Sequence, residues 1–214
     1  MLYRIRIFLW KILGIEYHHA LKIHEYVFLK NDSFSTIGHK TYDNGALVWR
    51  WTEAELKIGK YCSIANNVRF IVDEGYHQAS KVTSFPLVNN LFKEELLLPN
   101  GKNKSDFLKE VKQREGITIG NDVWIGMGSY IMPGAKIGNG VTIASNSVVV
   151  GNSDIPDYCV IGGSPAKIIK FKHEKQTIEK LNRIAWWNWD EEVIKKRVED
   201  FYMTMDDFIK KYDN

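Results

Sequence analysis

The sequence predicts a mainly β protein, a parallel β-helix with a long inserted loop and a C-terminal α-helical segment. Aliphatic residues recur at every sixth position, the period breaks between Val72 and Ile119, and the apolar spacing becomes helical after Lys170. A period of six fits neither a helix nor a simple strand, whereas stacked six-residue units bury one continuous aliphatic core. The aliphatic series is Ile119, Ile125, Ile131, Ile137, Ile143, Val149, Ile155 and Ile161.

Size and charge fit a globular protein of 214 residues with a net charge of +3. This charge is too small to indicate nucleic acid, and no basic cluster alternates with aromatic residues. Cys62 and Cys159 lie inside repeat units, where we expect reduced core thiols. No set of histidines and cysteines has zinc spacing, so no metal is expected.

Residues 1–30 are predicted to be an N-terminal, mostly helical segment. Its first part is apolar with Arg4, Arg6 and Lys11 interleaved, and it lacks both the apolar core and the cleavage site of a signal peptide. We expect this helix to pack on the domain, without membrane contact. The alternative is a basic amphipathic contact with a membrane surface.

Residues 31–170 are predicted to form the β-helix, with an inserted loop at 73–116. Each six-residue unit supplies a strand and a turn, and three units close one coil. Repeat signals begin at Ile37 and Ile58, and the segment Tyr42–Glu55 between them is irregular and aromatic. A structureless loop of forty residues is uncommon in a compact domain and is usually functional. A short helix is expected within it at Asp106–Gln113.

Residues 171–214 are predicted to be helical. Ile178, Leu181 and Ile184 have helical spacing, and Asp190 is the expected N-cap of a second helix. The aromatic cluster at 186–189 (WWNW) lies between the two helices. We interpret it as packing, at a hinge or between subunits.

Several motifs resemble those of the hexapeptide acyltransferases, and most closely the xenobiotic acetyltransferase branch. The motifs of the superfamily are IGNDVWIG at 119–126, IMPG at 131–134 and GGSPAK at 162–167. Those of the branch are IGKYCSI at 58–64, Tyr76-His77 followed by TSFP at 83–86, and WWNW at 186–189. The branch includes type B chloramphenicol and streptogramin acetyltransferases and O-acetyltransferases of surface-polysaccharide gene sets. The resemblance implies a left-handed β-helix, a cytoplasmic homotrimer and acetyl-CoA as the co-substrate.

His77 is the catalytic residue that the resemblance implies. It would act as the general base, taking the proton from the acceptor as its oxygen or nitrogen attacks the thioester. Histidine suits this role because its ordinary pKa lies near neutral pH. No acid follows His77 at the position usual for the branch. Asp73, Glu74 or a backbone carbonyl could orient the ring.

The remaining site residues are also implied by the resemblance or by residue type. Trp124, Met127 and Ser145 would line the pantetheine arm of CoA, and Lys167 and Lys170 would meet its phosphates, although each lysine could equally be a solvated charge. Acceptor candidates come from the irregular segments, where aromatic and polar side chains suit a sugar or a drug and could equally be packing. They are Tyr42, Asp43, Asn44, Trp49, Trp51 and Phe85.

The predicted function is transfer of an acetyl group from acetyl-CoA to a hydroxyl or amine of a sugar, nucleotide-sugar or glycan precursor. The aromatic segment 42–51 and the altered sequence after His77 favour the sugar. The close alternative is a chloramphenicol- or streptogramin-type antibiotic O-acetyltransferase. A third alternative is a non-catalytic trimeric scaffold or a relative of the carbonic anhydrases, although the latter needs metal-binding histidines that the sequence does not show.

Overall fold

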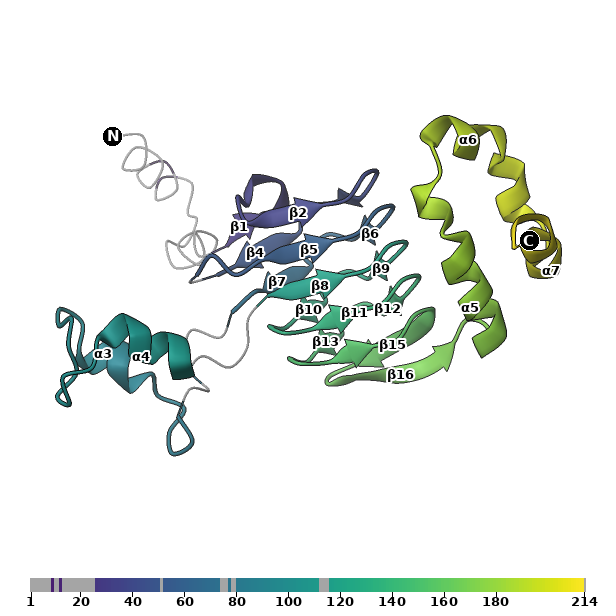
Figure 1. Ribbon diagram of the computed structural model, residues 1–214. Helices are drawn as coiled ribbons and strands as arrows, with labels where there is room; N and C mark the ends of the chain where they lie inside the picture. The colour runs from purple at the N-terminus through teal and green to yellow at the C-terminus, as the bar shows by residue number, and fades with distance from the viewer. Residues whose placement is uncertain are drawn as a thin grey trace.

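The computed structural model describes Leu9, Ile12, His77 and residues 26–50, 52–73, 80–111 and 116–213. Its strands form three sheets, and the chain visits them in turn, so that each circuit adds one strand to every sheet. Figure 1 shows these circuits as the rungs of one stack. This arrangement is the parallel β-helix that the six-residue period predicts.

Neighbouring strands of each sheet come from successive circuits of the chain. In spatial order, sheet A contains β1 (Val27–Phe28), β4 (Leu47–Trp49), β7 (Arg69–Ile71), β10 (Tyr130–Ile131) and β13 (Val148–Val149). Sheet B contains β14 (Asp154–Ile155), β11 (Lys136–Ile137), β8 (Ile117–Ile119), β5 (Leu56–Ile58) and β2 (Ser35–Ile37). Sheet C contains β16 (Ala166–Phe171), β15 (Cys159–Gly163), β12 (Thr142–Ile143), β9 (Trp124–Ile125), β6 (Ser63–Ile64) and β3 (Tyr42–Asp43). Pairing is antiparallel for β1 with β4 and for β15 with β16, and the other neighbours are parallel.

The strand register confirms the period of six. Ile119 pairs with Ile137, which pairs with Ile155, so the chain returns to the same sheet after three six-residue units. In the run 119–161 the aliphatic residue of each unit points inward and is buried, apart from the partly buried Ile155, whereas the residue before it points outward. Stacking these identical positions forms the main core of the protein. Cys62 and Cys159 are buried free thiols in that core, as predicted, and burial raises the pKa of both thiols.

The segment Tyr42–Glu55 is not irregular, contrary to its prediction. It contains β3 and β4 and completes a coil of the stack. The period is hard to see there because the polar Asp43 stands in register with Ile64, Val48 follows it after only five residues, and Ile58 follows ten residues later.

The N-terminal segment lies largely outside the described residues. Its last part, expected to be helical, instead forms β1, which pairs with β4 at one end of sheet A. A 3₁₀ turn, η1 (Leu29–Asn31), follows it and buries Leu29. No helix in the described ranges is long and apolar enough to cross a membrane.

Close backbone contact holds the corner between sheets B and C. A Cβ atom built on Gly59 would lie 2.3 Å from the carbonyl oxygen of Gly120, so this corner has no room for a side chain. Beside it, amides bridge successive coils: Asn139 Oδ1 accepts from the Asn121 backbone, and Asp157 Oδ1 accepts from the Asn139 backbone. Asn182 Nδ2 donates to Asp157 Oδ2 at 2.7 Å and thereby ties the C-terminal segment to the stack.

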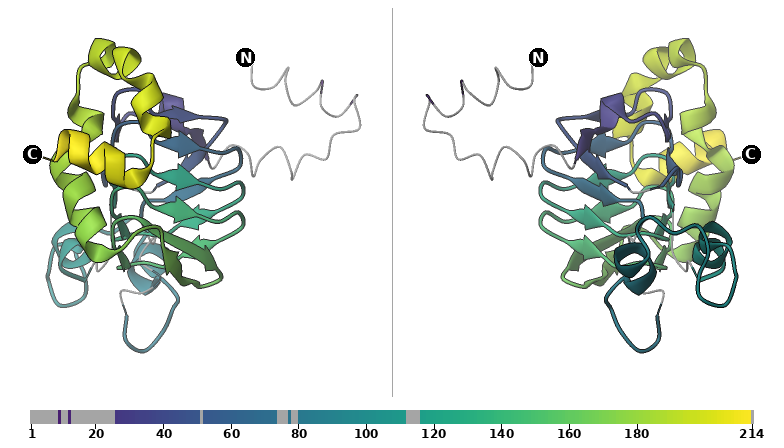
Figure 2. Two further views of the ribbon diagram at one scale, coloured as in Figure 1. Left: turned by 90° about the vertical axis from the view of Figure 1, so that its right-hand side faces the viewer. Right: turned by 90° about the vertical axis from the view of Figure 1, so that its left-hand side faces the viewer.

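The C-terminal segment contains α5 (Lys175–Ile184), α6 (Glu191–Lys196) and α7 (Met205–Tyr212), with 3₁₀ turns η2 (Trp186–Asn188) and η3 (Val198–Tyr202) between them. Figure 2 shows these helices along one side of the stack. Asp190 is the N-cap residue of α6, as predicted. Trp187 is buried in an aromatic cluster with Phe208, which confirms that the WWNW segment packs. Lys40 and Lys195 bind Glu191, and these contacts lower the pKa of that carboxyl to about 2.

The inserted loop forms an arm that projects away from the stack (Figure 1). It carries α3 (Leu87–Leu91) and α4 (Lys104–Val111), and the second of these covers most of the helix predicted at Asp106–Gln113. The arm leaves sheet A after β7 and returns to sheet B at β8, so its root lies at the corner between those sheets. The Gly116 amide donates to the Val72 carbonyl at 2.9 Å and closes this root.

Candidate active site

His77 lies in the first part of the arm, and its side chain is exposed. Its Nδ1 atom is 3.0 Å from the backbone carbonyl oxygen of Ser84. A carbonyl can only accept, so Nδ1 carries a proton, and the neutral ring in this tautomer has its free lone pair on Nε2. Asp73, one of the acids considered for orienting the ring, instead accepts hydrogen bonds from the backbone and hydroxyl of Thr52.

Two hydroxyl groups hold the turn that presents the Ser84 carbonyl. Ser80 Oγ accepts from the amides of Val82 at 3.1 Å and Thr83 at 3.2 Å. Thr83 Oγ1 accepts from the Phe85 amide at 3.1 Å. Side chains of this type stabilise local turns by replacing backbone partners. The TSFP motif therefore has a local structural role that its sequence alone does not reveal.

The residues predicted to bind CoA lie on sheet C and at its corner with sheet A. Trp124 stands in the outward row of sheet C and is 58% exposed, and Met127 and Ser145 follow at the corner, both exposed. Lys167 and Lys170 lie on β16 at the end of the same sheet, exposed to solvent.

One outward row of side chains on sheet C runs from Tyr42 past Trp124 to Lys170 and so connects the residues predicted to bind the pantetheine arm and the phosphates of CoA. The row consists of Tyr42, Ser63, Trp124, Thr142, Val160 and Lys170. Adjacent strands are about 4.8 Å apart, so the row is roughly 24 Å long. It offers a surface of mixed character, in which Ser63 and Thr142 alternate with Trp124 and Val160, with an aromatic residue at one end and a cation at the other.

The acceptor candidates divide between two places. Tyr42 and Asn44 are exposed on and beside β3, and Asp43 Oδ1 accepts from the amides of Gly45 and Ala46, which gives Asp43 a role in its own turn. Trp49 lies near the root of the arm, where its carbonyl accepts from the Val72 amide. Phe85 lies on the arm itself, half exposed. Trp51 is outside the described residues.

The predicted site residues therefore do not converge within one chain. His77, Phe85 and Trp49 belong to the arm and its root at the corner of sheets A and B. The coenzyme candidates and Tyr42 lie on sheet C, the wall opposite that corner.

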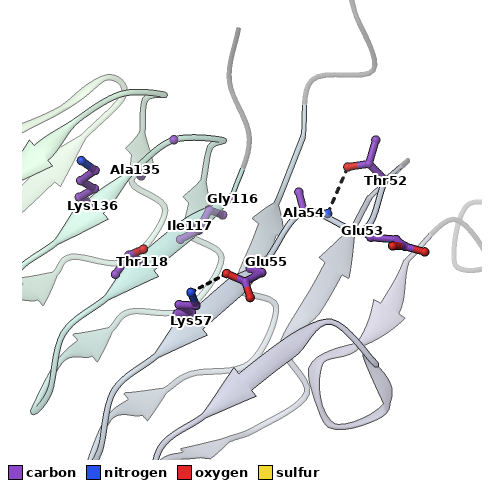
Figure 3. A pocket seen from close by; sticks show the side chains of 11 residues that line it. Thr52, Glu53, Ala54, Glu55, Lys57, Gly116, Ile117, Thr118, Ala135 and Lys136 are labelled. Carbon is purple, nitrogen blue, oxygen red and sulfur yellow. Dashed lines mark hydrogen bonds and ion pairs between the residues drawn. The ribbon is translucent and has the colours of Figure 1, made fainter. Parts of the chain in front are cut away.

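Two hollows could not be predicted from the sequence. One of about 540 Å³ lies at the root of the arm, and Figure 3 shows Glu55 paired there with Lys57 near Thr118 and Lys136. The charged residues at every second position of 53–57 were the available signal for it, and they do not distinguish a hollow from a solvated surface.

The second hollow, of about 200 Å³, lies between the stack and the C-terminal helices. It is lined by Asp122, Tyr158, Lys172 and His173 together with aromatic side chains. Burial raises the pKa of Asp122 to about 6, although nearby Lys172 opposes the shift. Burial also lowers the pKa of Lys172 and of His173. Within the described part of the chain, no group of three or more histidine, cysteine or acidic side chains could hold a metal ion.

Comparison with known proteins identifies the repeats. The family described as "Bacterial transferase hexapeptide (six repeats)" matches residues 116–151. A probable macrolide acetyltransferase of Lysinibacillus sphaericus is 36% identical over 162 residues, which are 75% of this chain and 84% of that protein. A chloramphenicol acetyltransferase of Morganella morganii is 42% identical over 66% of this chain, and the match spans 63% of that relative's length.

A shorter match is to another transferase. The putative lipopolysaccharide biosynthesis O-acetyl transferase WbbJ of Escherichia coli K12 is 46% identical over 69 residues, or 32% of this chain and 34% of that one. The match to the probable macrolide acetyltransferase is much longer than the 116–151 segment that the family description covers. The chain belongs to the hexapeptide-repeat acyltransferases, and within them to the xenobiotic acetyltransferase branch.

Proposed function

We propose that the protein transfers an acetyl group from acetyl-CoA to a hydroxyl or amine, with His77 as the general base. The observation that supports this role best is the 3.0 Å contact between His77 Nδ1 and the Ser84 carbonyl. It holds the ring in the tautomer whose Nε2 can accept a proton, which is what a neutral base needs.

The proposed step needs no covalent acyl-enzyme. Nε2 of His77 takes the proton as the acceptor oxygen or nitrogen bonds to the thioester carbonyl carbon. The carbon–sulfur bond then breaks, and the CoA thiolate leaves with that proton as the free thiol. Between these events the tetrahedral oxyanion requires preorganised donors, and backbone amides of an adjacent coil are our candidates.

We propose that CoA lies along the outward row of sheet C, with Trp124 against the pantetheine arm and Lys170 toward the phosphates. The exposed aromatic face and the terminal cation of that row support this placement. Met127, Ser145 and Lys167 border the same path.

Self-association follows from the same proposal, and the family resemblance makes the proposed assembly a homotrimer. His77 and the proposed coenzyme row lie on opposite sides of one chain, so a neighbouring copy would have to bring the two together. The left-handed coil and the cytoplasmic location that the resemblance implies belong to this proposal too. Sedimentation equilibrium tests the assembly, since a protein that is active as a monomer would contradict it.

Two acceptor classes remain, each with a specific observation in its favour. A sugar, nucleotide-sugar or glycan precursor agrees with Tyr42 and Asn44 beside the row and with the lipopolysaccharide O-acetyl transferase relative. An apolar antibiotic-type alcohol agrees with the macrolide and chloramphenicol acetyltransferase relatives, which match more of the chain. Release of free thiol from acetyl-CoA, measured with chloramphenicol, a macrolide and a set of sugars, separates the two classes.

Replacement of the base tests the mechanism. His77→Ala should lower turnover about 10²–10⁴-fold, the usual contribution of a general base, and leave the melting temperature unchanged. His39→Ala is the matched control, because His39 is also exposed but contacts Glu191 on the far side of the stack. Near-full activity of the His77 variant would refute its role. Failure of the wild type to bind CoA in calorimetry would favour a scaffold.

A further inference from the structure

The arm encloses a hollow of about 240 Å³ between α3 and α4. Most of its wall is apolar and includes the side chains of Phe85, Val88, Phe107, Leu108 and Val111. Ser80 and Asn89 are the polar side chains of the lining. A mostly apolar hollow with a few polar groups is the usual form of a small-molecule site.

The carboxamide oxygen of Asn89 is buried and has no hydrogen-bond partner. Within the part of the chain that the structure describes, no other buried side-chain nitrogen or oxygen is left in this state. A buried acceptor without a donor costs stability, and native proteins rarely keep one without a reason. A water molecule needs two to four polar partners, and the lining offers it only Asn89 and the hydroxyl hydrogen of Ser80, whose oxygen already accepts from two amides. A ligand that brings its own donor on an apolar body fits this lining better than water does.

The hollow shares its wall with the turn that orients His77. Ser80 lines the hollow and also holds the turn, and Phe85, another wall residue, directly follows Ser84, whose carbonyl contacts the ring. A molecule seated in the hollow therefore contacts the turn that orients the proposed base, whereas the His77 ring itself does not line the hollow.

We propose that this hollow binds the apolar end of the acyl acceptor, a ring or branched alkyl group that carries one hydrogen-bond donor for Asn89 Oδ1. The inference rests on the proposed function, because it takes the ligand to be the acetyl acceptor. The size is suitable, since a cavity of about 150 Å³ already holds benzene and this one leaves room for a polar substituent.

Binding of two small probes tests the site without catalysis. Benzyl alcohol has a ring and a donor, whereas toluene has the ring alone. In titrations of the full-length protein followed by methyl NMR, we expect both to shift Val88, Leu108 and Val111. Benzyl alcohol should bind about tenfold more tightly, the usual gain when a buried acceptor obtains a donor. Asn89→Leu should reduce this ratio to about one without lowering the melting temperature.

Matched variants complete the test. Asn90→Leu alters the neighbouring exposed residue of α3, outside the hollow, and should keep the tenfold ratio. Leu108→Trp should fill the hollow and abolish both affinities. Three results would overturn the proposal. They are equal affinities of the wild type for benzyl alcohol and toluene, NMR shifts that fall elsewhere in the protein, and a tenfold ratio of the two affinities that survives Asn89→Leu. Because no acetyl-CoA is present, these results are independent of the activity of His77→Ala, so the inference and the proposed function can fail separately.

Discussion

The stack and the arm are built by different rules. In the stack, one aliphatic residue per unit is buried against identical residues of the coils above and below. In the arm, neither α3 nor α4 buries a residue completely, and Val82 and Leu96 are 94% and 79% exposed. Short hydroxyl-capped turns shape the arm locally. The fold is thus specified by the repeats, and the orientation of the proposed base is specified by local hydrogen bonds outside them.

A charge in the core should break the stack. Ile137 is buried between Ile119 and Ile155, so Ile137→Asp places a carboxyl where no partner exists. An unpaired buried charge costs several kcal/mol, which is comparable with the ~5–15 kcal/mol that stabilises a typical domain. We expect loss of the cooperative melting transition in circular dichroism.

Lys136→Asp is the matched control, because it places the same residue one position earlier on the exposed side of β11. It should melt within a few degrees of the wild type. A folded Ile137→Asp variant would show that the inward and outward positions are assigned wrongly.

Removal of the charge of Asp122, at the corner between sheets B and C, should raise the stability, and by less than Ile137→Asp lowers it. Burial raises the pKa of Asp122 to about 6, above its ordinary value of 3.8. At pH 7.5 the folded protein must keep a partly buried carboxylate, whereas near pH 4 the group is mostly protonated when folded. The protonated Asp122 carboxyl is therefore the form that favours folding, and the stabilisation it gives at low pH is lost as the pH rises through about 6. Asp122→Asn should gain about 1–2 kcal/mol at pH 7.5, less than the full shift implies because the residue is partly exposed.

Urea unfolding at pH 7.5 and pH 4 measures this difference, and the gain should disappear at the lower pH. Asparagine also tolerates the left-handed backbone of this position, where φ is 57°. Asp154→Asn, at an exposed position of sheet B, should change stability little at either pH. A gain that is independent of pH would mean that burial of charge is not its cause.

The structure of the stack could largely be predicted from the sequence, whereas the contacts within the arm could not. The period of six predicts the pairing of Ile119 with Ile137 because every unit repeats the same pattern. It fails at Tyr42–Glu55, where Asp43 stands in register with Ile64 and the next register positions, Val48 and Ile58, follow after five and ten residues. The position of His77 is found from motifs alone, whereas its contact with the Ser84 carbonyl depends on a turn conformation that no periodicity encodes. The orphaned oxygen of Asn89 arises from tertiary packing, so the sequence carries no signal for it.

The smallest expected effect concerns that turn. Thr83→Val preserves the shape of the side chain but removes the acceptor of the Phe85 amide. The Ser84 carbonyl would then hold His77 less firmly, and less of the ring would keep the tautomer with a free Nε2. We expect the turnover number to fall about 3- to 10-fold, in keeping with the net worth of one hydrogen bond. The KM for acetyl-CoA and the melting temperature should not change, because the arm contributes little to the core.

Steady-state kinetics across a range of pH distinguishes positioning from general damage. If Thr83 acts through His77, the double variant with His77→Ala should lose no further activity, since the orienting bond has nothing left to orient. Thr36→Val removes a hydroxyl from an exposed strand position of sheet B and should leave the turnover unchanged. If the losses in the double variant are additive, the turn affects the reaction by a route other than His77. The arm would then have to carry a second group that acts in the reaction.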